Sequence, residues 1–385
     1  MRWRFSDPND LTESRARATI EAKIDAWWSA FSKTAPRLDA LFKGRAKWDL
    51  PAWMAEHLGA IDPDLMWEFG RGLRGGHRLV ITPEHRRHRR PLTSATLSKA
   101  PAIAGWEFYA YRLADPLDEA LATIQGRTNI DFSRARAVVQ DTDDGGVNLT
   151  FSSPDFAALG EEAAGGAAFV ATEVQLGEEV LDRFVDIIDV SMDPADTASV
   201  GLEALPRVVG DRVATSGKRI SPAPFIERGD VEWTLWQLKP KEEPDYPHQL
   251  DLFVGKSALP EMWMRGHSNR VFSSARFSRF GETFCFVKLD GSQGIEKEGF
   301  ADKSEIEDAL DTALRAAGLG AHTGGGTGRR YSYVDLALLD VEKSIPVIRE
   351  TLRRGRVPKR SWLLFYDDSL RSEWVGIWDD TPPPP

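Results

Sequence analysis

Four arginines and two histidines stand close together in the stretch PEHRRHRRPL, residues 83–92. Paired guanidinium groups could bind phosphates, which is the chemistry of a nucleic-acid contact that weakens with salt. Nucleic-acid modules usually place aromatic side chains among the basic ones, and this stretch has none. We therefore favour a turn whose arginines pair with acidic residues of the same chain. The arginines concerned are Arg86, Arg87, Arg89 and Arg90.

Other residue types that carry chemistry are sparse. His85 and His88 are three residues apart, but the neighbouring arginines repel a cation and a zinc site needs three or four donors. The single cysteine, Cys285, lies in an apolar alternation typical of a small buried side chain, and it excludes an internal disulfide framework. No G-x-S-x-G motif occurs. We predict no catalytic, metal-binding or cofactor-binding residue and, with enzymatic activity undecided, lean against it.

Two carboxylates recur in the tripeptide WEF, at Glu68 and Glu107. If both lie on one face of a sheet, they could form a pair in which one pKa is raised for acid–base work. The alternative is cross-strand ion pairs with Arg78 and Arg112, which lie near the ends of the same predicted strands. We favour the ion pairs.

The glycine-rich stretch GLGAHTGGGTGRRYSY, residues 318–333, resembles a phosphate-binding loop only superficially. Such a loop carries Gly-Lys-Ser/Thr and opens a helix, whereas these glycines follow a helix and precede a strand. We predict a flexible helix-to-strand loop in which Arg329 and Arg330 could contact an anion or a partner.

The strand expected from YSYVDLALLD places Tyr331, Tyr333 and Asp335 on one face. A stripe of polar and aromatic side chains could be a surface for a protein partner. It could equally be an edge whose charge prevents aggregation. The sequence leaves both interpretations open.

The elements that position these residues indicate an α+β fold. An apolar stripe from Ile20 to Phe31 predicts a helix that ends or kinks at Pro36. Alternating segments then predict a mainly antiparallel sheet, with tight hairpins at residues 72–76 and 142–146. A second helix is expected near residues 50–58, and a further helical stretch at 156–174.

The chain divides, on these patterns, into an α+β domain (1–205), a connector that contributes strands (206–275), an α/β sandwich (276–380) and a disordered tail (381–385). The connector is rich in proline and charge. In the sandwich, strands alternate with helices that Asp302 and Ser344 could cap. We expect two helices packed on one face of its sheet.

The composition is that of a globular protein, with 42% apolar and 28% charged residues and a net charge of −10. Charge is unevenly spread, since residues 113–213 hold 20 acidic and only 6 basic side chains. No apolar run reaches the length of a membrane helix, and the first residues lack the apolar stretch of a secretory signal. We expect a cytoplasmic protein without membrane contact.

Two resemblances follow from these motifs. The order WWSAF, LMWEFG, HRLVITPE, KAPAIAGWEFYAYR and VQLGEEVLDRFVDII, over residues 20–195, resembles a bacterial family of uncharacterised domains. Residues 280–380, through YSYVDLALLD, SIPVIRETLRR and SWLLFYDD, resemble the regulator of ribonuclease E activity B family. The second resemblance implies a ferredoxin-like α/β sandwich that binds a protein partner and has no catalysis of its own.

We therefore expect a non-enzymatic regulatory protein that binds another protein. The acidic block at 113–213 would suit a basic partner, for instance a nuclease to be modulated or a toxin to be neutralised. The alternative, from another class, is a nucleic-acid-binding or processing factor that uses the arginines of residues 86–90.

Overall fold

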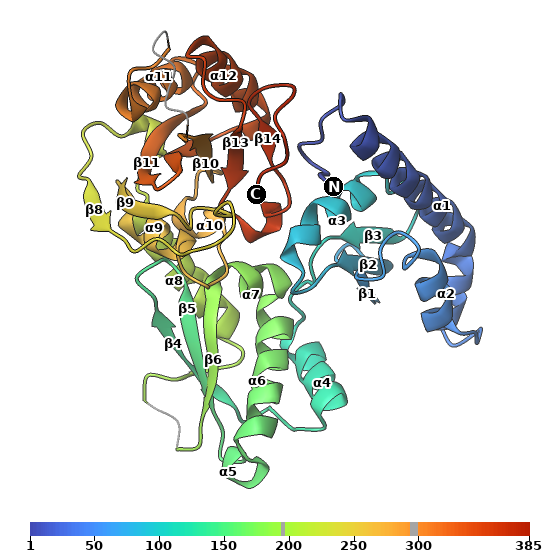
Figure 1. Cartoon of the computed structure of the whole chain (residues 1–385). Helices are drawn as coiled ribbons and strands as arrows, with labels where there is room; N and C mark the ends of the chain where they lie inside the picture. Colours follow the sequence, from blue (N-terminus) through green and yellow to red (C-terminus); the bar gives the residue numbers. More distant parts are fainter. Residues whose placement is uncertain (194–196, 293–298) are drawn as a thin grey trace.

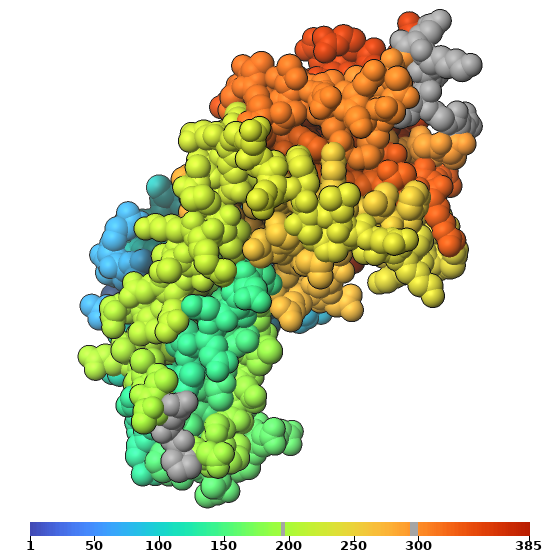
Figure 2. Space-filling model, turned by 90° about the vertical axis from the view of Figure 1, so that its left-hand side faces the viewer, coloured from blue at the N-terminus to red at the C-terminus, as the bar shows by residue number. Residues whose placement is uncertain are grey.

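The computed structural model describes residues 1–193, 197–292 and 299–385 and contains three sheets, each with its own helices (Figure 1). We call residues 1–112 the N-terminal unit, 113–220 the middle unit and 221–385 the C-terminal unit. The middle unit lies at one end of the molecule and the C-terminal unit at the other (Figures 1 and 2).

The N-terminal unit packs helices on a three-stranded sheet of order β1-β2-β3. Trp27, Trp28 and Phe31 of the first helix form the centre of its core. Of the two outcomes predicted at Pro36, an end or a kink, the helix does not end there: it continues to Phe42, because the apolar stripe continues and buries Leu38 against the same core. The elements are α1 (Leu11–Phe42), α2 (Leu50–His57), β1 (Met66–Arg71), β2 (His77–Thr82), the 3-10 turn η1 (Arg87–Arg89), α3 (Arg90–Ser98) and β3 (Trp106–Tyr109).

The middle unit has a second sheet, of order β6-β5-β4-β7, covered by α6 and α8, and α4 packs against α6. Gly160, at a φ of 82°, separates the two helices that follow β5, in the stretch predicted as helical. The elements are α4 (Leu117–Thr128), β4 (Arg136–Asp141), β5 (Val147–Ser152), α5 (Phe156–Leu159), α6 (Glu161–Leu176), α7 (Glu178–Phe184), β6 (Val185–Ser191), β7 (Val200–Gly201) and α8 (Leu205–Ile220).

The hairpins predicted at 72–76 and 142–146 are present, each closed by a backbone hydrogen bond. The prediction of a mainly antiparallel sheet in residues 1–205 is only partly right. There are two mixed sheets, in which β2 pairs with β3 and β5 pairs with β6 in parallel. In both cases a helix lies between the two parallel strands in the sequence. This crossover carries the chain back to the end of the sheet where the first strand began, so the second strand runs parallel to it.

The C-terminal unit has a seven-stranded sheet of order β14-β13-β10-β12-β11-β9-β8, in which all neighbours are antiparallel. Helices α11 and α12 cover one face, and Asp302 and Asp340 cap them, in the second case instead of the expected Ser344. The elements are η2 (Phe225–Glu227), β8 (Thr234–Gln237), β9 (Leu252–Ser257), α9 (Pro260–Gly266), α10 (Ser274–Phe277), β10 (Thr283–Asp290), α11 (Lys303–Ala316), β11 (Gly320–Gly328), β12 (Tyr331–Leu338), α12 (Val341–Arg354), β13 (Ser361–Phe365), η3 (Asp368–Leu370) and β14 (Val375–Gly376).

The glycine-rich stretch is a strand and not the flexible loop that its composition predicts. It forms β11, which pairs with β12 on one side and β9 on the other. A Cβ at Gly324 would lie 2.4 Å from the carbonyl oxygen of Lys256, and one at Gly326 would lie 2.5 Å from that of Val254. These close approaches, and not loop flexibility, require the glycines.

Residues 221–275 of the predicted connector and the tail are parts of the C-terminal unit. Strands β8 and β9 complete its sheet, as expected of a connector that contributes strands, while α8 belongs to the middle unit. The tail, predicted to be disordered, packs at Pro382, whose carbonyl accepts a hydrogen bond from the indole nitrogen of Trp362 at 2.6 Å. Among the described residues, no helix combines the length and apolarity needed to cross a membrane.

Candidate functional site

Each arginine of the cluster at 86–90 forms an ion pair with a carboxylate of the same chain. Its carboxylate partners come from the loop before β1 and from α7, so the cluster joins the N-terminal and middle units. Arg90 is buried and also lies over the ring of Tyr111, at 3.8 Å from its centroid. The pairs are Arg86–Asp64 at 3.3 Å, Arg87–Asp182 at 2.9 Å, Arg89–Asp62 at 3.2 Å and Arg90–Glu178 at 2.7 Å.

Glu68 and Glu107 lie on the same face of the first sheet but have different partners. Glu68 lies 3.5 Å from Arg78 and 3.2 Å from Arg112. Burial raises the pKa of Glu68, while both guanidiniums oppose the rise. Glu107 accepts hydrogen bonds from the backbone of Arg74, at 2.8 Å, and from the hydroxyl of Tyr109. Glu68 thus has the ion pairs expected with Arg78 and Arg112, whereas Glu107 has neither of these partners.

Tyr331, Tyr333 and Asp335 share a strand face, as predicted, but they are not a partner surface. All three are buried beneath the loop that joins β8 to β9. Tyr331 donates a hydrogen bond to Asp245 of this loop at 2.7 Å, and Tyr333 donates one to Asp251. The interpretation as a surface is therefore wrong, because a segment some 80 residues earlier in the chain covers the stripe.

Arg329 and Arg330 also bind carboxylates of the chain. Arg330 lies 2.8 Å from both Asp245 and Asp290, and Arg329 pairs with Glu242. An anion or partner at this turn would have to displace these pairs. Within residues 1–193, 197–292 and 299–385, no three potential donors among His, Cys, Asp and Glu converge as a metal site.

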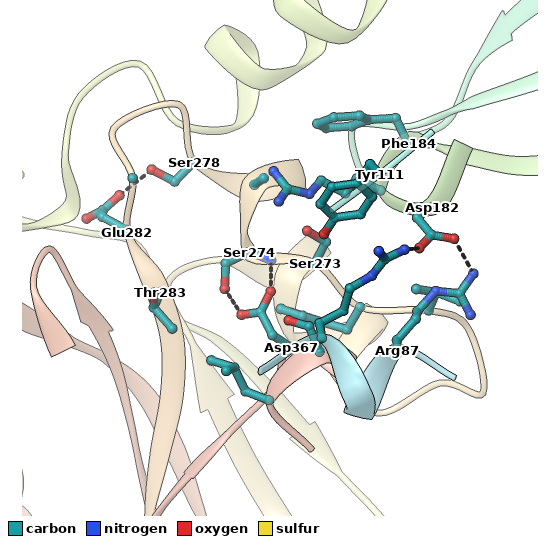
Figure 3. A pocket seen from close by; sticks show the side chains of 18 of the residues that line it. Arg87, Tyr111, Asp182, Phe184, Ser273, Ser274, Ser278, Glu282, Thr283 and Asp367 are labelled. Atoms are coloured by element: carbon teal, nitrogen blue, oxygen red, sulfur yellow. Dashed lines mark hydrogen bonds and ion pairs between the residues drawn. The ribbon is translucent and has the colours of Figure 1, made fainter. Parts of the chain in front are cut away.

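A cleft of about 530 Å³ lies where the three units meet, and we call it the junction cleft (Figure 3). Arg87 and Tyr111 enter it from the N-terminal unit, Asp182 and Phe184 from α7, and Asp367 from the loop after β13. Its wall also includes Arg4, Arg90, Arg183, residues 271–275, Ser278, Arg279, residues 281–283, Ser369 and Leu370.

The junction cleft carries more positive than negative groups. Arg279 donates to the carbonyl oxygen of Val213 at 2.7 Å and to that of Ala275, and it has no carboxylate partner among the described residues. Its guanidinium lies 4.9 Å from the ring centroid of Phe184. A guanidinium bound only to carbonyls retains its full charge, so the cleft could hold an anion.

Ser274, one of the serines that line the cleft, is not set up as a nucleophile. The hydroxyl of Ser274 donates to Asp367 and accepts from the backbone N–H of Phe284 at 2.9 Å. The backbone N–H of Ser274 also donates to Asp367 at 2.7 Å, so the carboxylate anchors the start of α10. No histidine or cysteine is among the described residues that line the cleft, and this wall therefore supports binding better than acyl transfer.

A buried charge cluster holds the middle unit against the C-terminal unit beside this cleft. Asp144 and Asp186 of the middle unit bind Arg265 of α9 and Arg276 of α10. Hydrogen bonds from the two guanidiniums hold the pKa of Asp186 below its usual range, although burial alone would raise it. The cluster fixes the position of α10, and hence one wall of the cleft.

An acidic groove on the middle unit is the second candidate. Two adjoining hollows, of about 480 and 600 Å³, follow the first half of α6 and share Glu161, Glu162 and Gly166. Edge strand β6 forms one side, and no strand of the described residues lies beyond it in the sheet. Ile188 and Val190 of β6 line this side, while Ile187 of β6 and Phe169 of α6, which are not among the lining residues, are about half exposed, at 52% and 50%.

The sequence indicated the acidic block but not the groove. The exposed acids lie in the block of 113–213, whereas the edge position of β6 depends on strand pairing, which composition does not reveal. The junction cleft was missed altogether, because its residues come from segments spread along the chain from Arg4 to Leu370. No protein-family model, curated protein or solved structure matches the chain.

Proposed function

We propose that this chain is a non-enzymatic regulatory protein and that the acidic groove binds a basic, extended segment of a protein partner. An open strand edge supplies backbone donors and acceptors that such a segment could pair with. Acidic side chains beside the edge then select lysine and arginine over acidic residues. A basic nuclease or toxin is the kind of partner that this surface would fit.

The observation that carries the proposal is the coincidence of three features at β6. The strand is at the edge of its sheet, it exposes Ile187, and Glu161 and Glu162 stand exposed beside it on α6. Glu161 and Glu162 line the groove together with Ile188 and Val190 of β6, so charge and apolar surface lie along the same groove. Protected edge strands usually lack such exposed apolar groups.

The test is binding of a fluorescein-labelled peptide in which lysine alternates with valine, compared with its glutamate counterpart, at low and moderate salt. The lysine peptide should bind and the glutamate peptide should not. The double variant Glu161→Lys/Glu162→Lys, and separately Ile187→Lys, should weaken binding by about tenfold or more. Glu203→Lys/Asp211→Lys changes as many exposed acids of the same unit and is the matched control. Equal losses in the control would overturn the proposal.

A second candidate function is the binding of an anionic group in the junction cleft. Arg279, with only carbonyl partners, favours it. Arg279→Gln should then weaken binding of inorganic phosphate measured by calorimetry. The nucleic-acid alternative has less support, because its four arginines would have to leave their carboxylates first.

We also propose that β10, α11, β11, β12, α12 and β13 form a ferredoxin-like sandwich, extended by β8, β9 and β14. The spatial order β13-β10-β12-β11 of these four strands supports the assignment. We propose likewise that this unit is related to the regulator of ribonuclease E activity B family, which its sequence resembles. We also propose that the protein is located in the cytoplasm.

A further inference from the structure

A separate pocket of about 300 Å³ lies on the face of the seven-stranded sheet that α11 and α12 leave uncovered. Residues of α9 and of the segment that joins β8 to β9 line it. Phe272, Phe286 and Tyr366 form aromatic walls, and Gln249 and His267 supply polar groups. We call it the aromatic pocket. Its size is at the lower end of the range for small-molecule sites.

His267 presents an unused hydrogen-bond acceptor at this pocket. Its Nδ1 lies 2.8 Å from the carbonyl oxygen of Trp263, so Nδ1 carries the proton and donates it. Its Nε2 is buried and has no hydrogen-bond partner in the part of the chain that the structure describes. Burial lowers the pKa of His267 to about 4, so the ring is neutral at pH 7. A buried acceptor without a donor is costly, and a ligand with an N–H or O–H group would satisfy it.

The imidazole is held rigidly. It stacks on Trp263, with ring centroids 3.9 Å apart, and Trp263 stacks on Trp236 at 4.1 Å and 8°. Behind the pocket, Tyr366 donates to Asp335 at 2.9 Å and accepts from the amide of Gln249 at 3.1 Å. The acceptor therefore has a fixed position, as a binding site needs.

The mouth of the pocket is positively charged. Lys239, Lys241 and Arg371 line it and are exposed, and within the described ranges none of the three has a carboxylate in an ion pair. Arg371 instead lies 3.3 Å from Nε2 of His248. Asp368 is the acidic residue of the lining, and it accepts a hydrogen bond from the backbone of Phe272 at 3.0 Å. The mouth thus attracts anions.

We infer that the aromatic pocket binds a small planar anion that carries an N–H or O–H donor. The ring of the ligand lies among Phe272, Phe286 and Tyr366, its donor reaches Nε2 of His267, and its negative group stays at the cationic mouth. An aromatic acid and a nucleoside monophosphate share this chemistry. The inference is independent of the acidic groove, which lies on another unit.

The test is calorimetric titration of the full chain with three probes: 4-hydroxybenzoate, adenosine 5′-monophosphate and uncharged adenosine. At least one anion should bind, adenosine should bind more weakly than its monophosphate, and the tryptophan fluorescence should change because Trp263 contacts His267. Binding of one anion and not the other identifies the source of the ligand.

The decisive variant is His267→Phe, which keeps the stacked ring and removes the acceptor. It should weaken binding of the responsive anion by about tenfold or more. His57→Phe is the matched control, because His57 also contacts the carbonyl of Trp53 through Nδ1, at 3.0 Å, and stacks on that ring. Thermal melts establish that both variants fold. Binding of neither anion at millimolar concentration, or equal binding by His267→Phe, would overturn the inference.

Discussion

Replacing Asp186 by asparagine should weaken the junction between the middle and C-terminal units more than any exposed acidic substitution. Asp186 receives four hydrogen bonds from Arg265 and Arg276, at 2.7 to 3.1 Å. The side chains of the two arginines are 3% and 1% exposed, and that of Asp186 is 6% exposed. Asparagine keeps the volume but removes the charge and leaves an N–H₂ group facing guanidiniums.

The expected loss in the free energy of unfolding is about 3 kcal/mol. Removing one partner of a buried ion pair typically costs 3–5 kcal/mol, because the remaining charge is left uncompensated. Asp144 still lies 2.8 Å from Arg265 and 3.1 Å from Arg276, which places the loss at the lower end. The exposed pair of Asp211 with Arg207 is the reference, and Asp211→Asn should cost less than about 0.5 kcal/mol.

Urea denaturation at several pH values measures both effects. The pKa of Asp186 is lowered in the folded state, so its contribution is fully present above the unfolded pKa of about 4 and is lost as the pH falls towards the folded value. The difference between the wild type and Asp186→Asn should therefore shrink below pH 4. A loss under about 1 kcal/mol at pH 7, or one equal to that of Asp211→Asn, would refute the reasoning.

Three further predictions concern other parts of the chain. Burial raises the pKa of Asp335 to about 6, so the free energy of unfolding falls as the pH rises from the unfolded pKa of about 4 to pH 6. In urea titrations, Asp335→Asn should therefore gain about 2 to 3 kcal/mol of stability at pH 8 and nothing at pH 4. An equal gain at both pH values would contradict this. Alanine at all four arginines of residues 86–90 should leave RNA and DNA filter binding unchanged, whereas a salt-sensitive affinity that disappears in the variant would restore the nucleic-acid alternative. Gly326→Val should lower the free energy of unfolding by about 1–3 kcal/mol, because the new side chain would collide with Leu252. Gly229→Ala should leave the thermal melt unchanged, because a Cβ added there meets no described atom within 4 Å.

Local signals in the sequence predicted local structure well. Both tight hairpins are present where Gly-rich turns separate alternating segments, and Asp302 caps α11 as its spacing indicates. Pro36 shows the limit of such rules, because burial of the residues around it keeps the helix intact. The direction of β3 and β6 depends on crossover helices, which residue alternation does not encode.

Side chains whose role depends on distant segments could not be placed from the sequence. The alternation of Tyr331 and Tyr333 was right, but whether that face meets solvent depends on the loop between β8 and β9. The glycines of β11 signalled flexibility by composition, whereas the close packing of β9 requires them. The sequence did not indicate His267 as a candidate ligand-binding residue. The feature that makes it one, an Nε2 acceptor with no hydrogen-bond donor among the described residues, arises only in the folded chain.

Hydrogen exchange of β6 tests the proposed protein-binding function most directly. Amide exchange of residues 185–191 is measured with and without a saturating amount of the lysine–valine peptide. Amides on the open edge of this strand should exchange more slowly with the peptide, and Glu161→Lys/Glu162→Lys should remove the effect. Peptide binding that leaves residues 185–191 unchanged and protects another surface would contradict it.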